Sequence, residues 1–136
     1  MLIHQKIREK VTALLTGNIP LINHIYPCRP LFIDIDQEKA VIAVFLSDIE
    51  AQEISLCSHQ WNAALNIAIY LKTAEGEAEL DRIAEQVKQC LQQAVKTEAI
   101  FDVVNEISLT EYLYEQDQTN RTWFVANIRY QINYED

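Results

Sequence analysis

Apolar and polar residues alternate with a period of two between Trp61 and Leu71, where the sequence is W-N-A-A-L-N-I-A-I-Y-L. One side of this segment is entirely apolar and consists of Trp61, Ala63, Leu65, Ile67, Ile69 and Leu71. The other side is half polar and includes Asn62, Asn66 and Tyr70. This alternation predicts a long strand with one buried face. The second face is too polar for a deep core and more apolar than solvent contact requires, so we expect it to meet another surface, such as a second subunit.

Three segments that precede this strand have a less regular pattern. Residues 40–46, A-V-I-A-V-F-L, are apolar on both sides and rich in β-branched residues, which predicts a central strand. Residues 31–35 predict a short edge strand that follows a loop over residues 17–30. The polar, acidic segment 47–60 contains no two-residue turn signal, so it is either a long mobile connection or a β-arm between two strands.

The C-terminal third of the chain predicts a pair of strands over residues 105–114 and 122–134. In the first strand, we expect Tyr112 and Tyr114 on the face opposite Ile107, Leu109 and Leu113. In the second strand, the core-facing positions are Phe124, Ala126, Ile128, Tyr130, Ile132 and Tyr134. Its mixed second face consists of Trp123, Val125, Asn127, Arg129, Gln131 and Asn133.

Two segments have the helical spacing of three and four residues. The first covers residues 2–16, where Gly17 is placed to end the helix and Pro20 cannot continue it. The second begins at Thr73 or Gly76 and carries one apolar stripe: Leu80, Ile83, Ala84, Val87, Cys90, Leu91 and Ala94. Residues 98–104 are predicted to form one further helical turn under the sheet.

Together these elements predict an α+β fold with a single sheet of four or five strands, mostly antiparallel or mixed. Each helix has one apolar stripe, so both are expected on one face of the sheet. Each of the two strand pairs is joined without a helix, which favours antiparallel pairing. The uncovered face would then carry aromatic residues at positions 70, 112, 114 and 123, and exposed aromatic area of this kind is typical of an interface.

Composition narrows the possible classes of protein. A length of 136 residues is typical of one domain, here residues 1–136. A net charge of −9 argues against binding to the phosphates of nucleic acid or to anionic membranes. We also find no signal peptide and no apolar run long enough to span a membrane. The three cysteines form no C-x-x-C pair and are expected to be free thiols in a reducing cytoplasm.

No arrangement of residues in the sequence is typical of an active site. Cys57 and His59 supply two metal ligands at strand spacing, but no second pair completes a zinc site. Asp34, Asp36 and Glu38 are weak candidates for a divalent cation and otherwise form a solvated acidic turn.

Three charged residues in predicted loops are candidates for cation binding or ion pairing because of their position. Glu50 and Glu53 have the same two interpretations as the acidic turn: cation ligand or solvated loop. Arg29 lies between Pro27 and Pro30 and is expected to pair with a carboxylate, either on a neighbouring chain or within its own.

At the level of longer segments, the chain resembles the minor tail protein U family, the tail terminators of lambda-like siphophages. The most specific similar segments are the strand from Trp61 and W-F-V-A-N-I-R-Y-Q-I-N-Y-E from Trp123. Arg29-Pro30, A-V-I-A-V-F-L from Ala40 and E-A-E-L-D from Glu77 support them. Cys28 stands where the family pattern has a glycine, and the segments 47–60 and 115–121 depart from that pattern.

The resemblance implies a structural virion protein rather than an enzyme, and no cofactor. Members of this family form a hexameric ring on the last ring of tail-tube subunits, stop tube growth and present a surface to head-completion proteins. The chain would then be located in the virion tail after assembly in the bacterial cytoplasm, and DNA would only pass through the ring. A divalent cation such as Mg²⁺ would relieve repulsion between carboxylates during assembly.

The candidate residues for contacts between subunits or with partners come from the second sheet face and the loops: Arg29, Glu50, Glu53, Asn62, Asn66, Tyr70, Tyr112, Tyr114, Trp123 and Arg129. Two other functions fit the sequence. One is another neck or tail-completion connector of a phage. The other is a small-ligand regulatory domain, which would require a concave pocket with convergent polar groups.

Overall fold

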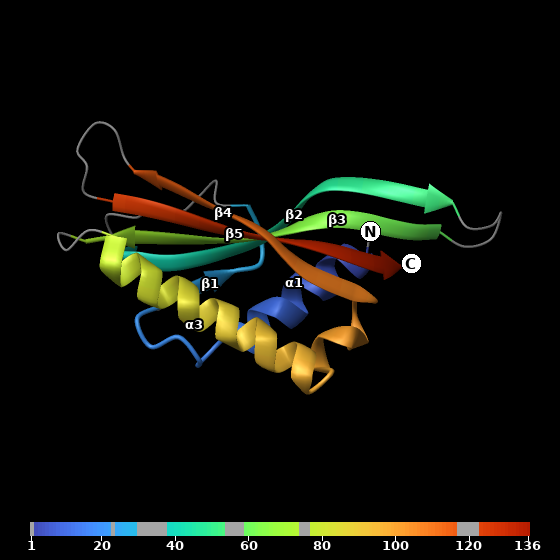
Figure 1. Cartoon of the computed structure of the whole chain (residues 1–136), viewed down its shortest axis with the longest axis horizontal. Coiled ribbons are helices and arrows are strands. Elements are labelled where there is room, and N and C mark those ends of the chain that lie inside the picture. The colour runs from blue at the N-terminus through green and yellow to red at the C-terminus, as the bar shows by residue number, and fades with distance from the viewer. Residues whose placement is uncertain (1, 23, 30–37, 54–58, 74–76, 117–122) are drawn as a thin grey trace.

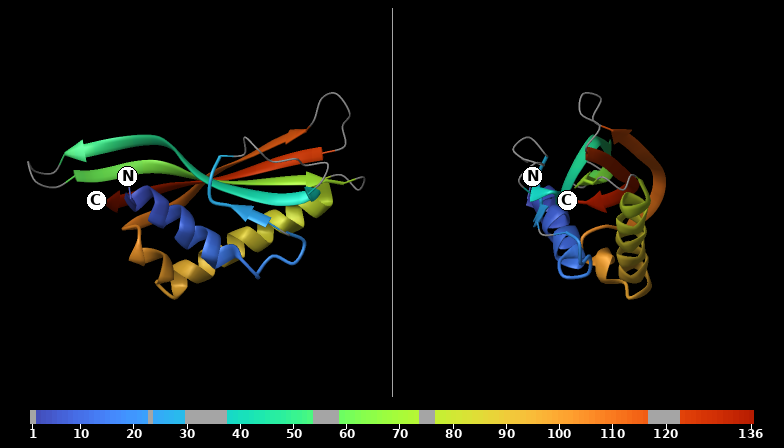
Figure 2. Two further views of the ribbon diagram at one scale, coloured as in Figure 1. Left: turned by 180° about the vertical axis from the view of Figure 1, so that it is seen from behind. Right: turned by 90° about the vertical axis from the view of Figure 1, so that its left-hand side faces the viewer.

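The architecture is one twisted sheet with both long helices on the same side (Figures 1 and 2). The computed structural model describes residues 2–22, 24–29, 38–53, 59–73, 77–116 and 123–136. The elements in chain order are α1 (Leu2–Leu15), β1 (His24–Tyr26), β2 (Ala40–Glu53), β3 (His59–Lys72), α3 (Glu77–Lys96), the 3₁₀ helix η1 (Ala99–Asp102), β4 (Glu106–Gln116) and β5 (Trp123–Glu135). The predicted α+β fold class is confirmed.

The sheet contains five strands in the order β1-β2-β3-β5-β4. The β2–β3 and β4–β5 pairs are antiparallel, as the sequence predicts, and so is the central β3–β5 pair. β1 is parallel to β2, so the sheet is mixed. The long strand that the alternation predicts is therefore the middle strand of the sheet.

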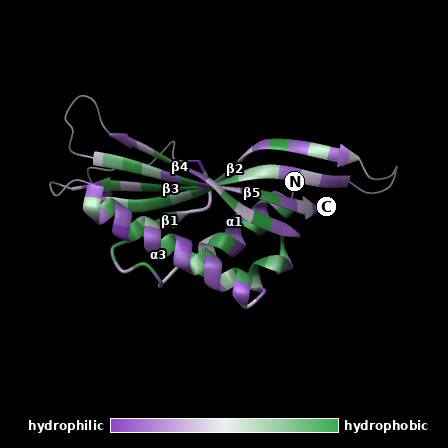
Figure 3. Ribbon diagram, in the orientation of Figure 1, coloured by the Kyte–Doolittle hydropathy of each residue, from purple (hydrophilic) through white to green (hydrophobic). Residues whose placement is uncertain are grey.

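Each helix buries the stripe that its sequence spacing predicts. α1 buries Ile7, Val11 and Leu15, and Gly17 follows with a φ of +81°, a left-handed conformation that suits glycine at a helix end. α3 buries six residues of its stripe, and hydrophilic bands alternate with hydrophobic ones along its length (Figure 3). The helical turn predicted near residue 100 is η1, where Ile100 is fully buried.

The hydrophobic core lies between the helices and the sheet. It contains the whole predicted face of β3 from Ala63 to Leu71 and the whole predicted face of β5. Trp61 is only half-buried but packs against this core. The sequence pattern therefore correctly predicts which side of each central strand, β3 and β5, faces the core.

In the first half of the chain, the structure adds a short strand to a predicted loop, and one predicted strand is not described. The loop predicted over residues 17–30 contains the short strand β1, which three residues are too few to reveal by pattern. β1 pairs in parallel with the stretch Val41–Ala43 of β2. The edge strand predicted over residues 31–35 lies outside the described residues.

The acidic segment after residue 46 forms a β-arm, one of the two alternatives that the sequence left open. β2 continues to Glu53, and β3 begins at His59. We call residues 47–53 and 59–62 the arm. Figure 1 shows the arm projecting beyond the helices at one end of the sheet. A register shift between Ser47 and Glu50 marks its base, where Asp48 has a φ of +51°.

The predicted orientation of Tyr112 and Tyr114 is wrong. A register shift between Leu109 and Glu111 inserts one residue into β4 and reverses the facing of every residue after it. Tyr112 lies opposite the core residue Ile128 and packs against the core. Tyr114 also faces the helix side, and its hydroxyl donates a hydrogen bond to Asp81 of α3 at 3.0 Å. Leu113 lies opposite Asn127 on the second face instead.

Candidate interaction surface

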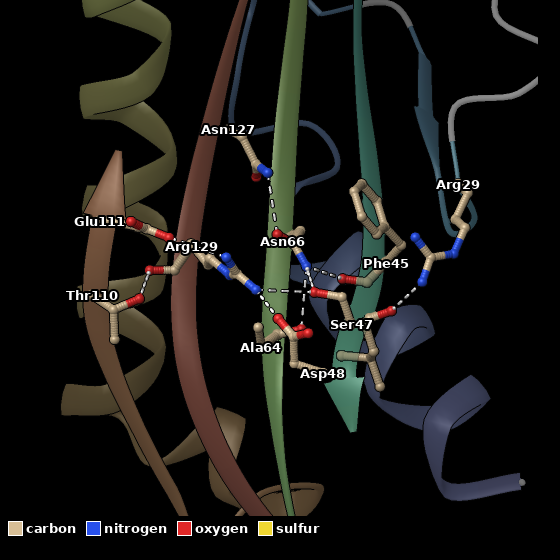
Figure 4. A network of polar contacts seen from close by, with 11 residues as sticks. Arg29, Phe45, Ser47, Asp48, Ala64, Asn66, Thr110, Glu111, Asn127 and Arg129 are labelled. Carbon is tan, nitrogen blue, oxygen red and sulfur yellow. Dashed lines mark hydrogen bonds and ion pairs between the residues drawn. The ribbon is translucent and has the colours of Figure 1, made fainter. Parts of the chain in front are cut away.

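A row of polar side chains crosses the sheet face that turns away from the helices (Figure 4). Asn66 lies at its centre and is 3% exposed. Its amide nitrogen donates a hydrogen bond to the Ser47 hydroxyl at 2.8 Å, and its amide oxygen accepts one from Asn127 at 3.1 Å. A buried amide with both ends bonded fixes the spacing of the strands around it. Asn66 has almost no surface to offer a partner directly.

Arg129 of β5 connects the two irregular points of the sheet. Its guanidinium forms an ion pair with Asp48, in the bulge at the base of the arm. Its other terminal nitrogen donates to Glu111, beside the β4 register shift, at 3.1 Å. Thr110, the extra residue of β4, donates its hydroxyl to the Arg129 carbonyl at 2.9 Å. One side chain therefore contacts both bulges, and the planar guanidinium presents its several donors in a fixed arrangement.

The same face continues from this row toward both ends of the sheet. On the arm side, Asn133 donates to the side-chain oxygen of Asn62 at 2.8 Å. At the opposite end, Tyr70 and Trp123 are half-buried. Burial raises the pKa of Tyr70, and the negative charge of Glu115 adds to that effect. Trp123 lies opposite Lys72 on β3.

Within the described residues, Arg29 contacts its own chain at β2, and the predicted pairing with a carboxylate stays a prediction. Its guanidinium donates to the Leu46 carbonyl at 3.0 Å and lies 5.1 Å from the centre of the Phe45 ring. Both contacts are on the part of β2 just beyond its pairing with β1. Arg29 therefore covers an otherwise open stretch of that edge.

The arm carries exposed acidic and apolar groups. Glu50 is exposed and Ile49 is 41% exposed. Glu53, at the end of β2, adds a second negative charge to the same strand. β1 pairs only with Val41–Ala43, so no described strand borders the outer edge of the arm.

The predicted cation turn is described only at Glu38. Asp34 and Asp36 lie outside the described residues. The Glu38 carboxylate accepts a hydrogen bond from the Tyr26 hydroxyl, which raises the pKa of Tyr26, and one of its oxygens lies 3.7 Å from His24 Nδ1. Within the described ranges, no group of three or more His, Cys, Asp or Glu side chains is arranged to hold a metal ion. No described helix has the length and apolar character needed to cross a membrane.

The sequence did not indicate several members of this surface. The sequence predicts Ser47 and Asp48 only as part of a long mobile connection or a β-arm, and it does not mark Glu111 or Asn127 as contact residues. No signal in the sequence marks them, because their contacts depend on two bulges that bring distant strands into a particular register. Arg129 was selected only for its place on the mixed face of β5.

The chain is similar to a known protein family and to individual proteins of two phages. A family model described as phage minor tail protein U matches residues 2–134. A tail tube terminator protein of Escherichia phage N15 is 25% identical over 133 residues, which cover 97% of this chain and 98% of the relative. A tail tube terminator protein of Escherichia phage lambda is 27% identical over 107 residues, or 79% of each chain.

A solved structure titled virion of native gene transfer agent particle aligns with 97% of this chain and 94% of its own, with a TM-score of 0.47 and 8% identity. The family match runs from the start of α1 to the end of β5 and includes every described strand and helix. This chain therefore belongs to the phage minor tail protein U family.

Proposed function

We propose that this chain is a tail terminator, which ends tail polymerisation by forming a ring on the last ring of tail-tube subunits. The ring is proposed to be a hexamer and to present its other side to head-completion proteins. The observation that carries the proposal is similarity over nearly the full chain to proteins named tail tube terminator. The function requires surfaces rather than an active site, and the chain is proposed to act without catalysis or a cofactor.

A ring of identical subunits requires two different, complementary surfaces on each subunit. The sheet offers two unlike edges that fit this requirement. The outer edge of β2 beyond Ala43 and the outer edge of β4 are both without a neighbouring strand among the described residues. They lie on opposite sides of the β3–β5 pair, so the edge of one subunit is free to meet the other edge of the next.

The size of the chain is compatible with two such contacts. An obligate contact buries on the order of 2,000 Å² in total, or about 1,000 Å² from each partner. The described structure exposes 7954 Å². Two neighbours in a ring would therefore cover on the order of a quarter of each subunit, which leaves surface for the tail tube and the head side.

The negative charge suits a passage for DNA. Carboxylates that face the lumen would repel phosphates and prevent DNA from sticking during ejection. The same carboxylates would repel one another across the ring, and Mg²⁺ would reduce that repulsion. Ring assembly is therefore expected to depend on Mg²⁺ and on monovalent salt. Assembly that is independent of both would contradict this part of the proposal.

The test is a mass measurement by sedimentation velocity, with negative-stain microscopy of the same samples, with and without tail tubes from the cognate phage. The proposal predicts ring-shaped particles with a central hole, free in solution or formed only on tube ends. A single monomeric species in both conditions would contradict it. Rings that bind a head connector but never the tube would favour another neck protein instead.

A further inference from the structure

A groove lies between the C-terminal half of α3 and the start of β4. Its volume is about 450 Å³. Leu91 and Val95 of α3 and Ile107 and Leu109 of β4 line it with apolar surface. Val95 and Leu109 remain 38% and 39% exposed, although both are large apolar residues on regular elements. Apolar surface of this kind is typical of a binding groove.

A buried hydroxyl in the groove has no partner. Tyr130 of β5 lines the groove and is 5% exposed. Its hydroxyl makes no hydrogen bond among the residues that the structure describes. An unpaired buried hydroxyl is costly, so an occupant that brought a hydrogen-bonding group within its reach would gain stability there.

The groove also carries positive charge in an otherwise acidic protein. Lys88 and Lys96 line it, eight residues apart, or about 12 Å along the helix. The ion pairs among the described residues are those of Lys10, His24 and Arg129, so neither lysine has an ion-pair partner among them. The groove therefore favours an acidic occupant with apolar side chains and free backbone groups.

The arm of a second copy has this chemistry. It carries exposed Ile49 and Glu50, Glu53 follows on the same strand, and the outer backbone edge of this stretch has no described strand beside it. Glu50 and Glu53 are three residues apart, about 10 Å in extended conformation, whereas the two lysines are about 12 Å apart along the helix. Because residues three apart in a strand point to opposite faces, an arm strand in the groove would present one of the two carboxylates directly to the lysines and its outer backbone edge to the Tyr130 side.

The topology places the arm and the groove so that they join different subunits. β2 and β4 lie on opposite sides of the β3–β5 pair. The arm projects at the end of the sheet where β4 begins (Figure 1), and the groove is lined by that start of β4 and by α3. An arm that enters a neighbour's groove leaves its own groove free for the next arm, and such a head-to-tail contact closes into a ring when the rotation permits.

We propose that, in the ring, the acidic arm of each subunit binds in the groove between α3 and β4 of the next subunit, where Tyr130, Lys88 and Lys96 receive it. This inference rests on the proposed ring function and assigns the surfaces that close the ring. Opposite charges direct the contact, and the apolar groove and the Tyr130 hydrogen bond give it stability.

Charge exchange tests this contact. A groove variant carries Lys88→Glu and Lys96→Glu, and an arm variant carries Glu50→Lys and Glu53→Lys. Each variant alone is expected to lose ring assembly on tube ends, because like charges meet at every contact. Assembly is expected to return when all four changes are combined in one chain, and also in an equal mixture of the two variants. Recovery in these two samples shows that the altered subunits are folded.

A more conservative variant tests the hydroxyl. Tyr130→Phe removes one oxygen that is unbonded in the described subunit, so thermal unfolding of the monomer is expected to be unchanged or slightly improved. The concentration needed for half-maximal ring assembly is expected to rise roughly 2- to 10-fold per contact. The control is Lys6→Glu with Arg82→Glu, two exposed positions outside the groove that produce the same change in net charge as the groove variant.

The outcomes separate the inference from the function on which it rests. If the unaltered chain forms no rings even on tubes, both are overturned. If it forms rings and the groove and arm variants assemble equally well, the inference is overturned and the ring function stands. If the groove variant forms normal free rings but no longer binds tubes, the occupant is the tube protein and the arm contact is overturned.

Discussion

On the helix-facing side of β3, Leu65, Ile67 and Ile69 are covered by α1 and α3, whereas on the other side Ala64, Asn66 and Ala68 are almost as inaccessible without any helix above them. The first side is buried by large aliphatic side chains from separate elements. The second side carries short alanine side chains at positions 64 and 68, and its one central polar group is hydrogen-bonded to Ser47 and Asn127.

The difference indicates where partners contact the molecule. The middle of the second face is closed and rigid, so a partner cannot enter it. The surfaces that remain accessible are its margins: the arm, the outer edge of β4 and the half-buried aromatic end at Tyr70 and Trp123.

The largest expected effect is on the helix-facing side. Ile67→Ala removes a fully buried side chain whose cavity the surrounding helices and strands cannot fill. We expect the free energy of unfolding to fall by about 2–5 kcal/mol, measured by urea denaturation. A loss below about 1 kcal/mol would show that this side is not the main source of stability.

A substitution at the centre of the second face is expected to lower the free energy of unfolding by less than one on the helix-facing side, but by a measurable amount. Asn66→Ala removes the acceptor of the Asn127 amide and the donor to the Ser47 hydroxyl, which keeps its contact with Arg129 at 3.4 Å. We expect a loss of about 1–3 kcal/mol in the same experiment. Asn62→Ala is the control, since Asn62 is half-buried and bonds only Asn133 among the described side chains. Equal effects of the two changes would contradict a special role for the central amide.

His4, at the edge of the core near the N-terminus, is expected to make the stability of the chain depend on pH. His4 lies against Trp61 and Tyr134, and Tyr134 lies 2.6 Å from its ring nitrogen. Burial, with nearby positive charge, lowers the pKa of His4 below 6.5. The unfolded chain therefore binds this proton first, and stability that is present above pH 6.5 is lost as pH falls through 6.5 and below.

Urea denaturation between pH 7.5 and 5.5 measures this dependence, with His4→Gln as the comparison. The unaltered chain should lose more stability over this interval than the variant does. Parallel pH profiles of the two proteins would mean that His4 does not contribute.

The smallest expected effect is at Tyr114 of β4, whose side chain faces the helices and not the second face that its sequence spacing predicts. Tyr114→Phe removes the hydrogen bond to Asp81, which is exposed, so the expected loss is at most about 1 kcal/mol in thermal or urea unfolding. If Tyr114 faced away from the helices, as its sequence spacing predicts, the substitution would change nothing. A double-mutant cycle with Asp81→Ala should show coupling between the two side chains, and its absence would argue against the contact.

Most of the fold is predictable from the sequence because the alternation of apolar and polar residues shows which side of a strand faces the core. The strand from Trp61 and the strand from Trp123 both bury the predicted faces. Prediction failed where one residue changed the register: Thr110 interrupts β4, and the facing of Tyr112 and Tyr114 is reversed after it. No composition signal marks that insertion.

The candidate surface was predicted less completely than the fold. Asn62, Asn66 and Arg129 were identified from the mixed faces of two strands, but the pattern did not show that Asn66 is buried. Asp48 and Glu111 become neighbours of Arg129 only through the two bulges. The groove between α3 and β4 depends on how a helix approaches an edge strand, which sequence spacing does not specify.

The most direct test of the central claim is electron microscopy of cognate tail tubes grown with and without the purified chain. The account predicts that added chain forms one ring with a central hole on the growing end, and that capped tubes do not lengthen when more tube subunit is supplied. Tubes that continue to grow at the same rate, with the chain remaining monomeric, would contradict it.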